Sequence, residues 1–197
     1  MKKIVSINKL TNNKFLNLYK ITYLIDGKNF DYFLASRRQL DKLECNSLST
    51  DAVRALPYVE KNGKIYVILI KEFRYALNNY IYSLPAGLVD KGESTRTAIA
   101  RELKEEIGAK VLSLKKVLGS SYSSAGLTDE TLECFYAKVD LAYNQKLDTN
   151  ESISFQAVEL DKLPQFVKTH KFCLPSALML KNFYLETKLK QAVIIEA

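Results

Sequence analysis

The sequence predicts an α+β protein, an α/β/α sandwich in which helices flank a mixed β-sheet core, preceded by a small antiparallel sheet. Residues 1–40 carry only strand-like patterns, whereas strand-like and helical patterns alternate after residue 52. The polar stretch between them, residues 41–50, lacks periodicity and is the best candidate for a linker. We therefore expect an N-terminal antiparallel domain over residues 1–45 and a larger domain over residues 46–197.

The N-terminal domain is expected to contain three strands. Apolar and polar side chains alternate over Ile4–Ile7, Phe15–Leu24 and Phe30–Leu34, which is typical of strands with one buried face. Asp26-Gly27 lies between the last two segments, and this dipeptide favours a two-residue hairpin turn. The pattern therefore predicts a small antiparallel sheet.

The larger domain is expected to begin with a hairpin and to continue with further strands. Ala52–Val59 and Ile65–Ile70 flank the turn dipeptide Asn62-Gly63, and the second segment is apolar enough for a central strand. Further strand-like patterns cover residues 111–118, 132–139 and 153–158. Together these segments predict the mixed sheet.

Two helices are expected in the larger domain. Thr95–Ile107 has helical periodicity, and Gly108 stands where a left-handed C-terminal cap belongs. An amphipathic helix is predicted over Pro175–Leu189, with proline in its first turn. Before the first helix, Leu84–Gly87 is expected to form a tight turn after a strand, so that its backbone can approach a ligand closely.

The composition is that of an ordinary soluble globular protein. Of the 197 residues, 47% are hydrophobic and 26% are charged. No apolar run approaches the roughly 18 residues of a membrane-spanning helix, and residues 1–14 lack the apolar region of a signal peptide. We therefore expect a cytoplasmic protein that does not interact with a membrane.

Histidine and cysteine usage argue against several kinds of metal and redox site. His170 is the only histidine, which disfavours chemistry based on a histidine pair. Cys45, Cys134 and Cys173 are far apart and show no C-x-x-C spacing, so neither a disulfide framework nor a zinc site is expected. The thiols are expected to be buried or to have no role.

The chain is basic, with a formal net charge of +7. Its lysines are scattered, without a dense basic block or an obvious helix for reading nucleic acid, so a nucleic-acid partner is not expected. A positive field that attracts an anionic nucleotide explains the same charge balance.

The helix predicted over residues 95–107 carries three glutamates on a confined surface. Glu102 and Glu106 lie one turn apart, and Glu105 lies on the neighbouring edge. The apolar face that packs on the sheet is formed by Ile99, Leu103 and Ile107. Like charges at this spacing repel by a few tenths of a kcal/mol, and acids in the last turn oppose the helix dipole by about 0.3–1 kcal/mol.

A hard divalent cation would offset this repulsion. Mg²⁺ prefers oxygen ligands and is commonly held by one or two carboxylates together with substrate phosphates. The alternative is a solvated acidic face that Arg101 and Lys104 partly neutralise. On the helix alone this alternative is at least as well supported.

The wider spacing resembles a known motif. Gly87, Glu93 and the run Arg101-Glu102-Leu103-Lys104-Glu105-Glu106-Ile107-Gly108-Ala109 match the fixed positions of the Nudix box, G-x5-E-x7-R-E-U-x-E-E-x-G-U, where U is aliphatic. Ala109 is smaller than the usual residue at the last position. The resemblance to the Nudix hydrolase superfamily implies the Nudix fold and metal-dependent cleavage of a phosphoanhydride bond in a nucleoside diphosphate derivative.

Other segments resemble the ADP-ribose pyrophosphatase branch of that superfamily, and so does the N-terminal sheet. These segments are Lys71–Arg74, Leu84–Gly87 and Ser123–Gly126 with Asp129 and Glu130. The resemblance implies hydrolysis of ADP-ribose to AMP and ribose 5-phosphate. It also implies a domain-swapped homodimer, in which the N-terminal sheet of one subunit helps to form the nucleotide pocket of the other. Two residues depart from the branch: Ala125 replaces a usual proline, and Ser83 replaces a residue that is often acidic.

The resemblance also implies the metal ligands. Glu102, Glu106 and the main-chain carbonyl of Ala86 would hold Mg²⁺, with Mn²⁺ as an alternative. Glu105 would be a further or bridging ligand with a part in catalysis. Carboxylates suit this role because phosphoryl transfer is catalysed mainly by positioning and charge neutralisation.

A catalytic base and substrate contacts complete the expected site. Glu130, on the glycine-containing loop after the box, is the expected base, with Glu133 as the second choice; an exposed turn residue is the alternative interpretation of Glu130. Arg74 resembles an arginine that grips the pyrophosphate or the terminal ribose, with a surface salt bridge as the alternative. Arg101 is expected to orient the acids of its helix, and Glu93 to brace the loop.

The adenine base is expected to stack on an aromatic ring from the N-terminal sheet. The candidates, most of which are expected to be core residues, are Phe15, Tyr19, Phe30, Tyr32 and Phe33.

Other functions remain open at this point. Nudix enzymes that act on nucleotide sugars, dinucleoside polyphosphates or oxidised nucleoside triphosphates use the same helix, and the fold does not choose among them. A non-catalytic ADP-ribose-binding regulator is a further alternative. The intact acids and a C-terminal segment that predicts one helix, not a winged DNA-binding module, weigh against it.

Overall fold

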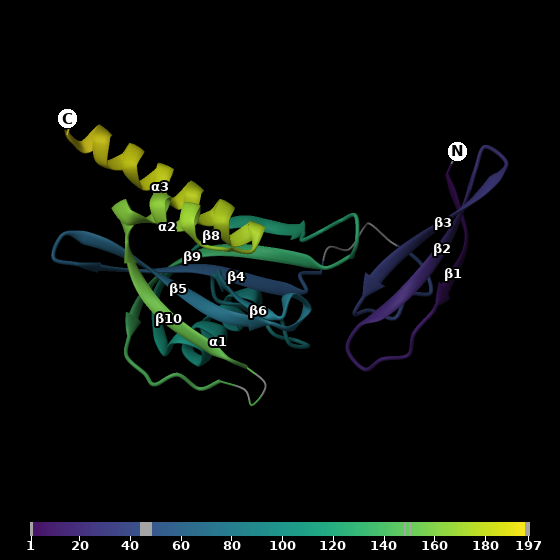
Figure 1. The fold of residues 1–197 in the computed structure, drawn as a ribbon, viewed down its shortest axis with the longest axis horizontal. Helices are drawn as coiled ribbons and strands as arrows, with labels where there is room; N and C mark the ends of the chain where they lie inside the picture. The colour runs from purple at the N-terminus through teal and green to yellow at the C-terminus, as the bar shows by residue number, and fades with distance from the viewer. Residues whose placement is uncertain (1, 44–48, 148, 150, 196–197) are drawn as a thin grey trace. The chain divides into compact units, whose positions relative to one another are not determined.

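A computed structural model describes residues 2–43, 49–147, 149 and 151–195, without the side chains of 192–195. The chain divides into two compact units (Figure 1). The N-terminal unit comprises residues 1–51 together with 120–132, and the larger unit comprises 52–119 together with 133–197. The boundary expected after residue 45 falls outside the described residues, as does Cys45.

The N-terminal unit contains the expected antiparallel sheet, in the order β1-β2-β3. Its strands are β1 (Lys3–Lys9), β2 (Asn17–Ile25) and β3 (Lys28–Ser36). Asp26 and Gly27 have φ angles of 49° and 78°, so both adopt the left-handed conformation that a two-residue hairpin turn requires. The predicted strands and turn are confirmed, and Tyr19, Ile21 and Leu34 are the buried side chains of this sheet.

The larger unit is built on a mixed seven-stranded sheet, with β10-β5-β4-β9-β8 in order, β6 paired with β5 and β7 paired with β4. The predicted α+β fold class is therefore confirmed. The strands are β4 (Ala52–Lys61), β5 (Lys64–Arg74), β6 (Asn79–Ser83), β7 (Ala86–Leu88), β8 (Ala109–Tyr122), β9 (Thr131–Leu141) and β10 (Ile153–Glu159). The helices are α1 (Thr95–Ile107), α2 (Leu163–Thr169) and α3 (Leu174–Ile195), with short 3-10 turns at Tyr75–Leu77 and Leu160–Lys162.

Helix α1 packs on one face of this sheet through the predicted apolar stripe. Ile99 and Leu103 are completely buried and Ile107 is 1% exposed, against Ile68 and Ile70 of β5. Helix α3 lies across the other face, where the ring of Phe183 meets the rings of Tyr58 and Tyr136 at centroid distances of 5.1 and 4.9 Å (Figure 1). Every other residue of a strand faces the same way, so Val53 and Ala55 pack toward α1 and Tyr58 toward α3.

Three expectations for the larger unit need correction. Leu84–Gly87 is not a tight turn: β6 ends at Ser83, and β7 begins at Ala86 and pairs with β4. Helix α2 and strand β6 were not expected, because each is short and neither has a clean apolar period. Helix α3 is longer than predicted and is not cleanly amphipathic, because several of its leucines and the leucine at its start are exposed. These leucines are Leu174, Leu178, Leu185 and Leu189.

Candidate active site

Helix α1 begins and ends at residues that satisfy its free backbone groups. The Ser94 hydroxyl accepts a hydrogen bond from the Thr97 N–H at 3.1 Å, which caps the N-terminus. Gly108 has a φ angle of 63° and forms the predicted left-handed cap. Because both ends are fixed, the glutamates between them have defined positions on the sheet.

Two of the three glutamates lie against the β7 segment. Glu106 is 4% exposed, and its Oε2 accepts a hydrogen bond from the Ala86 N–H at 3.3 Å. The carboxylate of Glu102 lies directly against Gly87, where any Cβ would overlap it. A Cβ at residue 87 would therefore displace the Glu102 carboxylate from the backbone.

Arg101 organises the acids around it. Its guanidinium donates to Glu93 through Nε at 3.2 Å and Nη2 at 3.1 Å, and to Glu102 through Nη1 at 2.7 Å. It also donates to Glu105 at 3.3 Å and to the Leu88 carbonyl at 3.0 Å. Glu93 in turn accepts from the Asp90 N–H at 3.2 Å. This network joins the loop before α1 to its acidic face, as expected for both Arg101 and Glu93.

Burial and like charge oppose ionisation of the two inner acids. Burial, reinforced by the charges of Glu102, Glu72 and Glu151, raises the pKa of Glu106 well above its usual range. Burial also raises the pKa of Glu102, although Arg101 acts in the opposite direction. Arg101 holds the pKa of Glu93 below its usual value. The negative charge is therefore most costly at Glu106, which no arginine or lysine contacts among the described residues.

A hard divalent cation fits this donor set. Carboxylate oxygens of Glu102 and Glu106 approach the same short strand, and the Ala86 carbonyl belongs to that strand. Glu105 is farther out, with its side chain 42% exposed and paired with Arg101. Within the described ranges, no three acidic, histidine or cysteine side chains already converge as a closed metal cage. Two carboxylates with open positions agree with Mg²⁺, which usually retains water or substrate ligands.

Arg74 lies at the end of β5 and is half-exposed. Its Nη2 donates to Glu72 Oε1 at 2.7 Å, and the Glu72 side chain is only 11% exposed. Glu72 is also one of the charges that raise the pKa of Glu106. Arg74 is thus connected through Glu72 to the acidic site of the larger unit.

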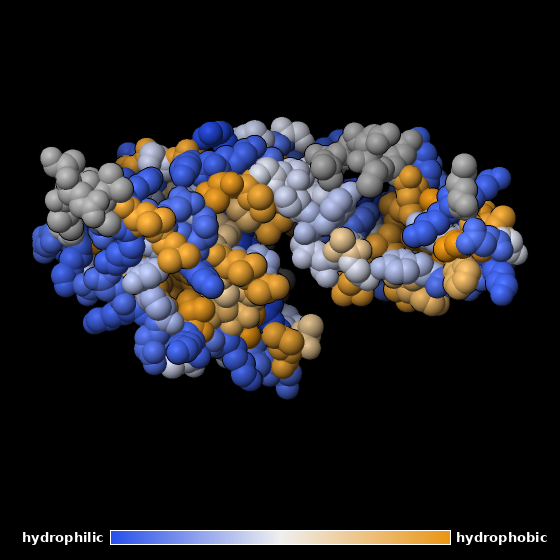
Figure 2. All heavy atoms as spheres, turned by 90° about the horizontal axis from the view of Figure 1, so that it is seen from above, coloured by the Kyte–Doolittle hydropathy of each residue, from blue (hydrophilic) through white to orange (hydrophobic). Residues whose placement is uncertain are grey.

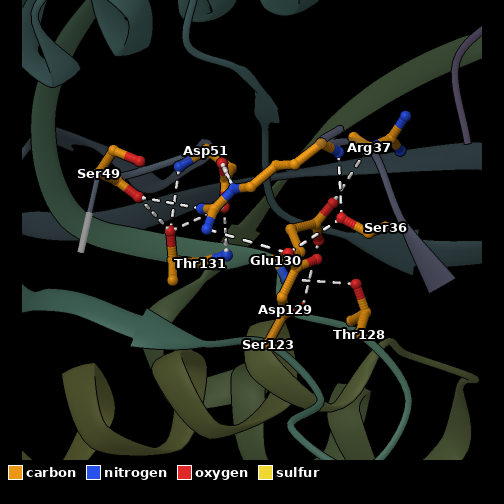
Figure 3. A network of polar contacts seen from close by, with 10 residues as sticks. Ser36, Arg37, Ser49, Asp51, Ser123, Thr128, Asp129, Glu130 and Thr131 are labelled. Atoms are coloured by element: carbon orange, nitrogen blue, oxygen red, sulfur yellow. Dashed lines mark hydrogen bonds and ion pairs between the residues drawn. The ribbon is translucent and has the colours of Figure 1, made fainter. Parts of the chain in front are cut away.

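Glu130 lies in the N-terminal unit, within a polar network (Figure 3). Its carboxylate accepts from the Arg37 Nε at 3.3 Å and from the Ser123 hydroxyl at 3.2 Å. Beside it, Asp129 accepts from the Ser36 hydroxyl at 2.9 Å. Glu133, the second choice for the base, is buried in the larger unit and pairs with Lys116 at 2.8 Å. Both candidate bases therefore have positively charged partners.

Glu151 is a site residue that the sequence reasoning missed. Its charge contributes to the raised pKa of both Glu102 and Glu106. Strand β10, which begins two residues later, pairs with β5 so that Ile153 lies opposite Glu72. Glu151 follows Glu102 by almost fifty positions in the sequence. Residues 149–153 form no periodic pattern or motif, so no local signal pointed to Glu151.

The aromatic candidates of the N-terminal sheet differ from the expectation that most are core residues. Tyr19 is buried, and its hydroxyl donates to the Arg38 carbonyl at 2.9 Å. The other four are exposed: Phe15 by 68%, Phe30 by 52%, Tyr32 by 43% and Phe33 by 52%. Apolar side chains are visible at the surface of this unit in Figure 2. Because few other residues of this small unit pack on the sheet, aromatic rings on both of its faces are exposed. They can contact a ligand or another protein surface.

The cysteines also need a partial correction. Cys134 is a buried core thiol, as expected, whereas Cys173 belongs to a polar cluster with Arg54. Neither forms a disulfide. In the part of the chain that is described, no helix is long and apolar enough to cross a membrane.

Comparisons with known proteins agree with this geometry. The family model of the NUDIX domain matches residues 48–177. A putative nudix hydrolase 2 of Caenorhabditis elegans is 38% identical over 127 residues, which are 60% of this chain and 56% of that protein. The ADP-ribose pyrophosphatase of Bacillus subtilis is 30% identical over 172 residues, which are 86% of this chain and 84% of that one.

A solved structure shows the same fold. The crystal structure of an ADP compounds hydrolase superposes with a TM-score of 0.69 at 19% identity, covering 95% of both chains. The range that the family model matches includes β7, the loop that follows it, and α1 with its glutamates. The chain therefore belongs to the Nudix hydrolase family, with the acidic face of α1 as its Nudix box.

Proposed function

We propose that this protein is a Mg²⁺-dependent pyrophosphohydrolase that cleaves ADP-ribose to AMP and ribose 5-phosphate. The observation that carries the proposal is the buried carboxylate of Glu106, whose ionisation three neighbouring acids oppose and which has no cationic partner among the described residues. A buried like-charge cluster of this kind is unfavourable unless a cation offsets it. The similarity to the ADP-ribose pyrophosphatase of Bacillus subtilis supports the choice of substrate.

The residues of α1 and β7 would divide the work of binding. Glu102, Glu106 and the Ala86 carbonyl would hold Mg²⁺, with Glu105 as a further ligand at the exposed edge. Bound there, Mg²⁺ would neutralise charge on the diphosphate and make a coordinated water more acidic. Arg101 holds Glu102 and Glu105 in place, so their positions need not be organised again at each turnover. Mn²⁺ satisfies the same oxygen ligands and remains an alternative cation.

The base that accepts a proton from the attacking water is assigned to one of two glutamates. Glu130 is the candidate that the family resemblance suggests, and its Arg37 and Ser123 contacts would keep it oriented. Glu151 is the candidate that the electrostatics of the larger unit suggest, because its charge acts on both Glu102 and Glu106. We favour Glu151 of the two, because it belongs to the same compact unit as Glu102 and Glu106 and its charge acts on both.

Glutamine variants separate these two candidates. Glu151→Gln should lower kcat by at least about 100-fold, within the range that general base catalysis contributes, and should remove the acidic limb of the pH–rate profile. Glu130→Gln should then leave kcat within about threefold of the wild type and retain that limb. The opposite result would assign the base to Glu130, and an unchanged kcat in both variants would contradict both assignments.

Substrate recognition would come from Arg74 and from the N-terminal sheet. The forked guanidinium of Arg74 suits a phosphate or ribose hydroxyl, and its pairing with Glu72 fixes its direction. The exposed rings of Phe15, Phe30, Tyr32 and Phe33 offer stacking surfaces for adenine. We further propose a domain-swapped homodimer, in which such a ring reaches the pocket of the partner subunit. Exposed apolar surface on a small sheet supports this assembly.

Turnover with product analysis tests the proposed function. Purified protein with MgCl₂ should convert ADP-ribose to AMP and ribose 5-phosphate, and EDTA should abolish the reaction. ADP-glucose, diadenosine polyphosphates and 8-oxo-dGTP serve as competing substrates, and preference for one of them would change the substrate but retain the reaction. Binding of ADP-ribose without hydrolysis of any of these compounds would indicate a regulator. The proposed dimer is tested separately: light scattering at micromolar concentration should give the mass of two chains. A cytoplasmic location stays a prediction.

A further inference from the structure

A partly buried polar cluster lies on the α3 side of the sheet, apart from the acidic face. Arg54 of β4 donates through Nη1 to Ser83 Oγ at 2.9 Å, to Cys173 Sγ at 2.9 Å and to Ser176 Oγ at 2.5 Å. Ser83 and Ser176 are completely buried. We call Arg54, Ser83, Cys173 and Ser176 the Arg54 cluster.

The charge of Arg54 has unusual partners. Its Nε is buried without a hydrogen-bond partner, and among the described residues no carboxylate forms an ion pair with it. Glu133 is close enough to Cys134 for its charge to act on that thiol, but its carboxylate pairs with Lys116 at 2.8 Å. Arg54 is partly buried, and a guanidinium held among neutral hydroxyls is more stable when a negative group lies beside it. Cys173 is the titratable side chain that contacts it.

The position of Cys173 favours a negative sulfur. The residue directly precedes α3, and its carbonyl accepts from the Ala177 N–H at 3.1 Å, which places the thiol at the positive N-terminal end of a 22-residue helix. The thiol donates to Ser176 Oγ at 3.1 Å and lies 3.4 Å from Ser83 Oγ. Burial is the largest single influence and raises the pKa of Cys173, but Arg54 and the hydrogen bonds with Ser176 and Ser83 together lower it. Burial raises the pKa of Cys134, and the opposite effect of Arg54 does not offset it.

The cluster is connected to the acidic face through three consecutive residues. Ser176 Oγ accepts from the Leu84 N–H at 3.0 Å, and the next carbonyl, of Pro85, accepts from the Ala55 N–H at 2.9 Å. The residue after that is Ala86, whose N–H donates to Glu106. On the α3 side of the sheet, the cluster therefore holds the backbone from Leu84 to Ala86. On the α1 side, the same backbone faces the metal-binding acids.

We propose that the Arg54 cluster positions the Leu84–Ala86 backbone for metal binding, with the Cys173 side chain as the charge partner of Arg54. This inference rests on the proposed function because it acts through Ala86 and Glu106. It also gives a physical reason for Ser83, which stands where the related branch often has an acid. Here the negative partner is Cys173, the residue before α3. Arg54 and Cys173 are positioning residues, because neither would touch the substrate.

Two substitutions at Cys173 separate charge from helix capping. Serine and aspartate are both good N-cap residues, so α3 should begin normally in Cys173→Ser and in Cys173→Asp, but aspartate alone keeps a negative charge. Mg²⁺ binding is followed as the increase in melting temperature with MgCl₂, without substrate. Cys173→Ser should raise the half-saturating Mg²⁺ concentration by about 10-fold. This is the low end of the loss in metal affinity that follows when a group supporting a metal ligand is replaced. Cys173→Asp should stay within about threefold of the wild type. Equal Mg²⁺ affinities in the two variants would overturn the proposal.

Alkylation of Cys173 tests the charge partner without metal or turnover. In the metal-free protein at pH 7, iodoacetamide should modify Cys173 faster than Cys134, as measured by peptide mass spectrometry. Arg54→Met should slow modification of Cys173 by about 10-fold, the effect of a one-unit rise in pKa on the thiolate fraction. An unchanged rate in Arg54→Met would refute the pairing. If the wild type hydrolyses no nucleotide but these two results hold, the proposed function fails while the cluster and its pairing stand.

Discussion

Replacing Glu106 by glutamine tests the central assignment most directly. The change preserves the shape of a side chain that is 4% exposed and keeps an acceptor for the Ala86 N–H, but it removes one negative charge from the metal-binding face. Groups that only support a metal ligand typically contribute about 10- to 100-fold to affinity or activity, so loss of a direct ligand should cost at least about 100-fold in kcat/KM. Steady-state hydrolysis of ADP-ribose measures this loss.

The same variant should change stability in the opposite direction. Burial and the neighbouring acids raise the pKa of Glu106, so its ionised form disfavours the folded state when no metal is present. Glu106→Gln should therefore raise the melting temperature of the metal-free protein at pH 7.5 and abolish the further increase caused by MgCl₂. Glu60→Gln is the matched control, because Glu60 forms an exposed ion pair with Lys138 at 2.7 Å. Near wild-type turnover in Glu106→Gln, or a Mg²⁺-dependent increase as large as that of the wild type, would refute the metal assignment.

Three further predictions follow from the same site. Gly87→Ala should lower kcat/KM by at least about 10-fold and weaken Mg²⁺ binding, because its Cβ would displace the Glu102 carboxylate; an active variant with normal Mg²⁺ affinity would contradict the contact. Glu93→Gln should raise the half-saturating Mg²⁺ concentration about 10-fold, because Arg101 loses the carboxylate that accepts two of its hydrogen bonds. Titration of turnover with MgCl₂ measures this concentration. An unchanged value would show that Arg101 does not need this carboxylate. In the metal-free protein, the free energy of unfolding should fall as the pH rises from the ordinary pKa of a glutamate to the raised pKa of Glu106, because the folded state binds the proton more tightly. Urea unfolding of the wild type and of Glu106→Gln at several pH values measures this dependence. The same pH dependence in both proteins would exclude Glu106 as its source.

The sequence was most informative where the relevant contacts are local. In α1, the apolar stripe, the left-handed cap at Gly108 and the spacing of Glu102 and Glu106 all follow from one helical repeat, and the observed helix has the predicted bounds. The two hairpin turns were predictable for the same reason, because the conformation of a two-residue turn depends on the residues within it.

The rest of the site depends on contacts between distant segments. Glu151 reaches the acidic face because β10 pairs with β5, and no pattern around residue 151 indicates that pairing. Arg54 and Cys173 are similarly separated by more than a hundred positions and come together because β4 runs beneath the start of α3. A charged residue in a strand and a single cysteine before a helix carry no local sign that they form one cluster.

Charge explains why these distant contacts matter to one another. The chain has a formal net charge of +7, yet Glu72, Glu102, Glu106 and Glu151 are electrostatically coupled in one place, where the basic residues of the chain do not neutralise Glu106. A protein that required only stability would gain from replacing such a buried acid with a neutral residue. The backbone beside these acids is held from both sides of the sheet, by Ser176 at Leu84 and by Glu106 at Ala86, and Arg101 holds Glu102 at 2.7 Å. The geometry thus maintains an unfavourable charge in a fixed position, which is what a site needs in order to bind a cation between itself and a diphosphate.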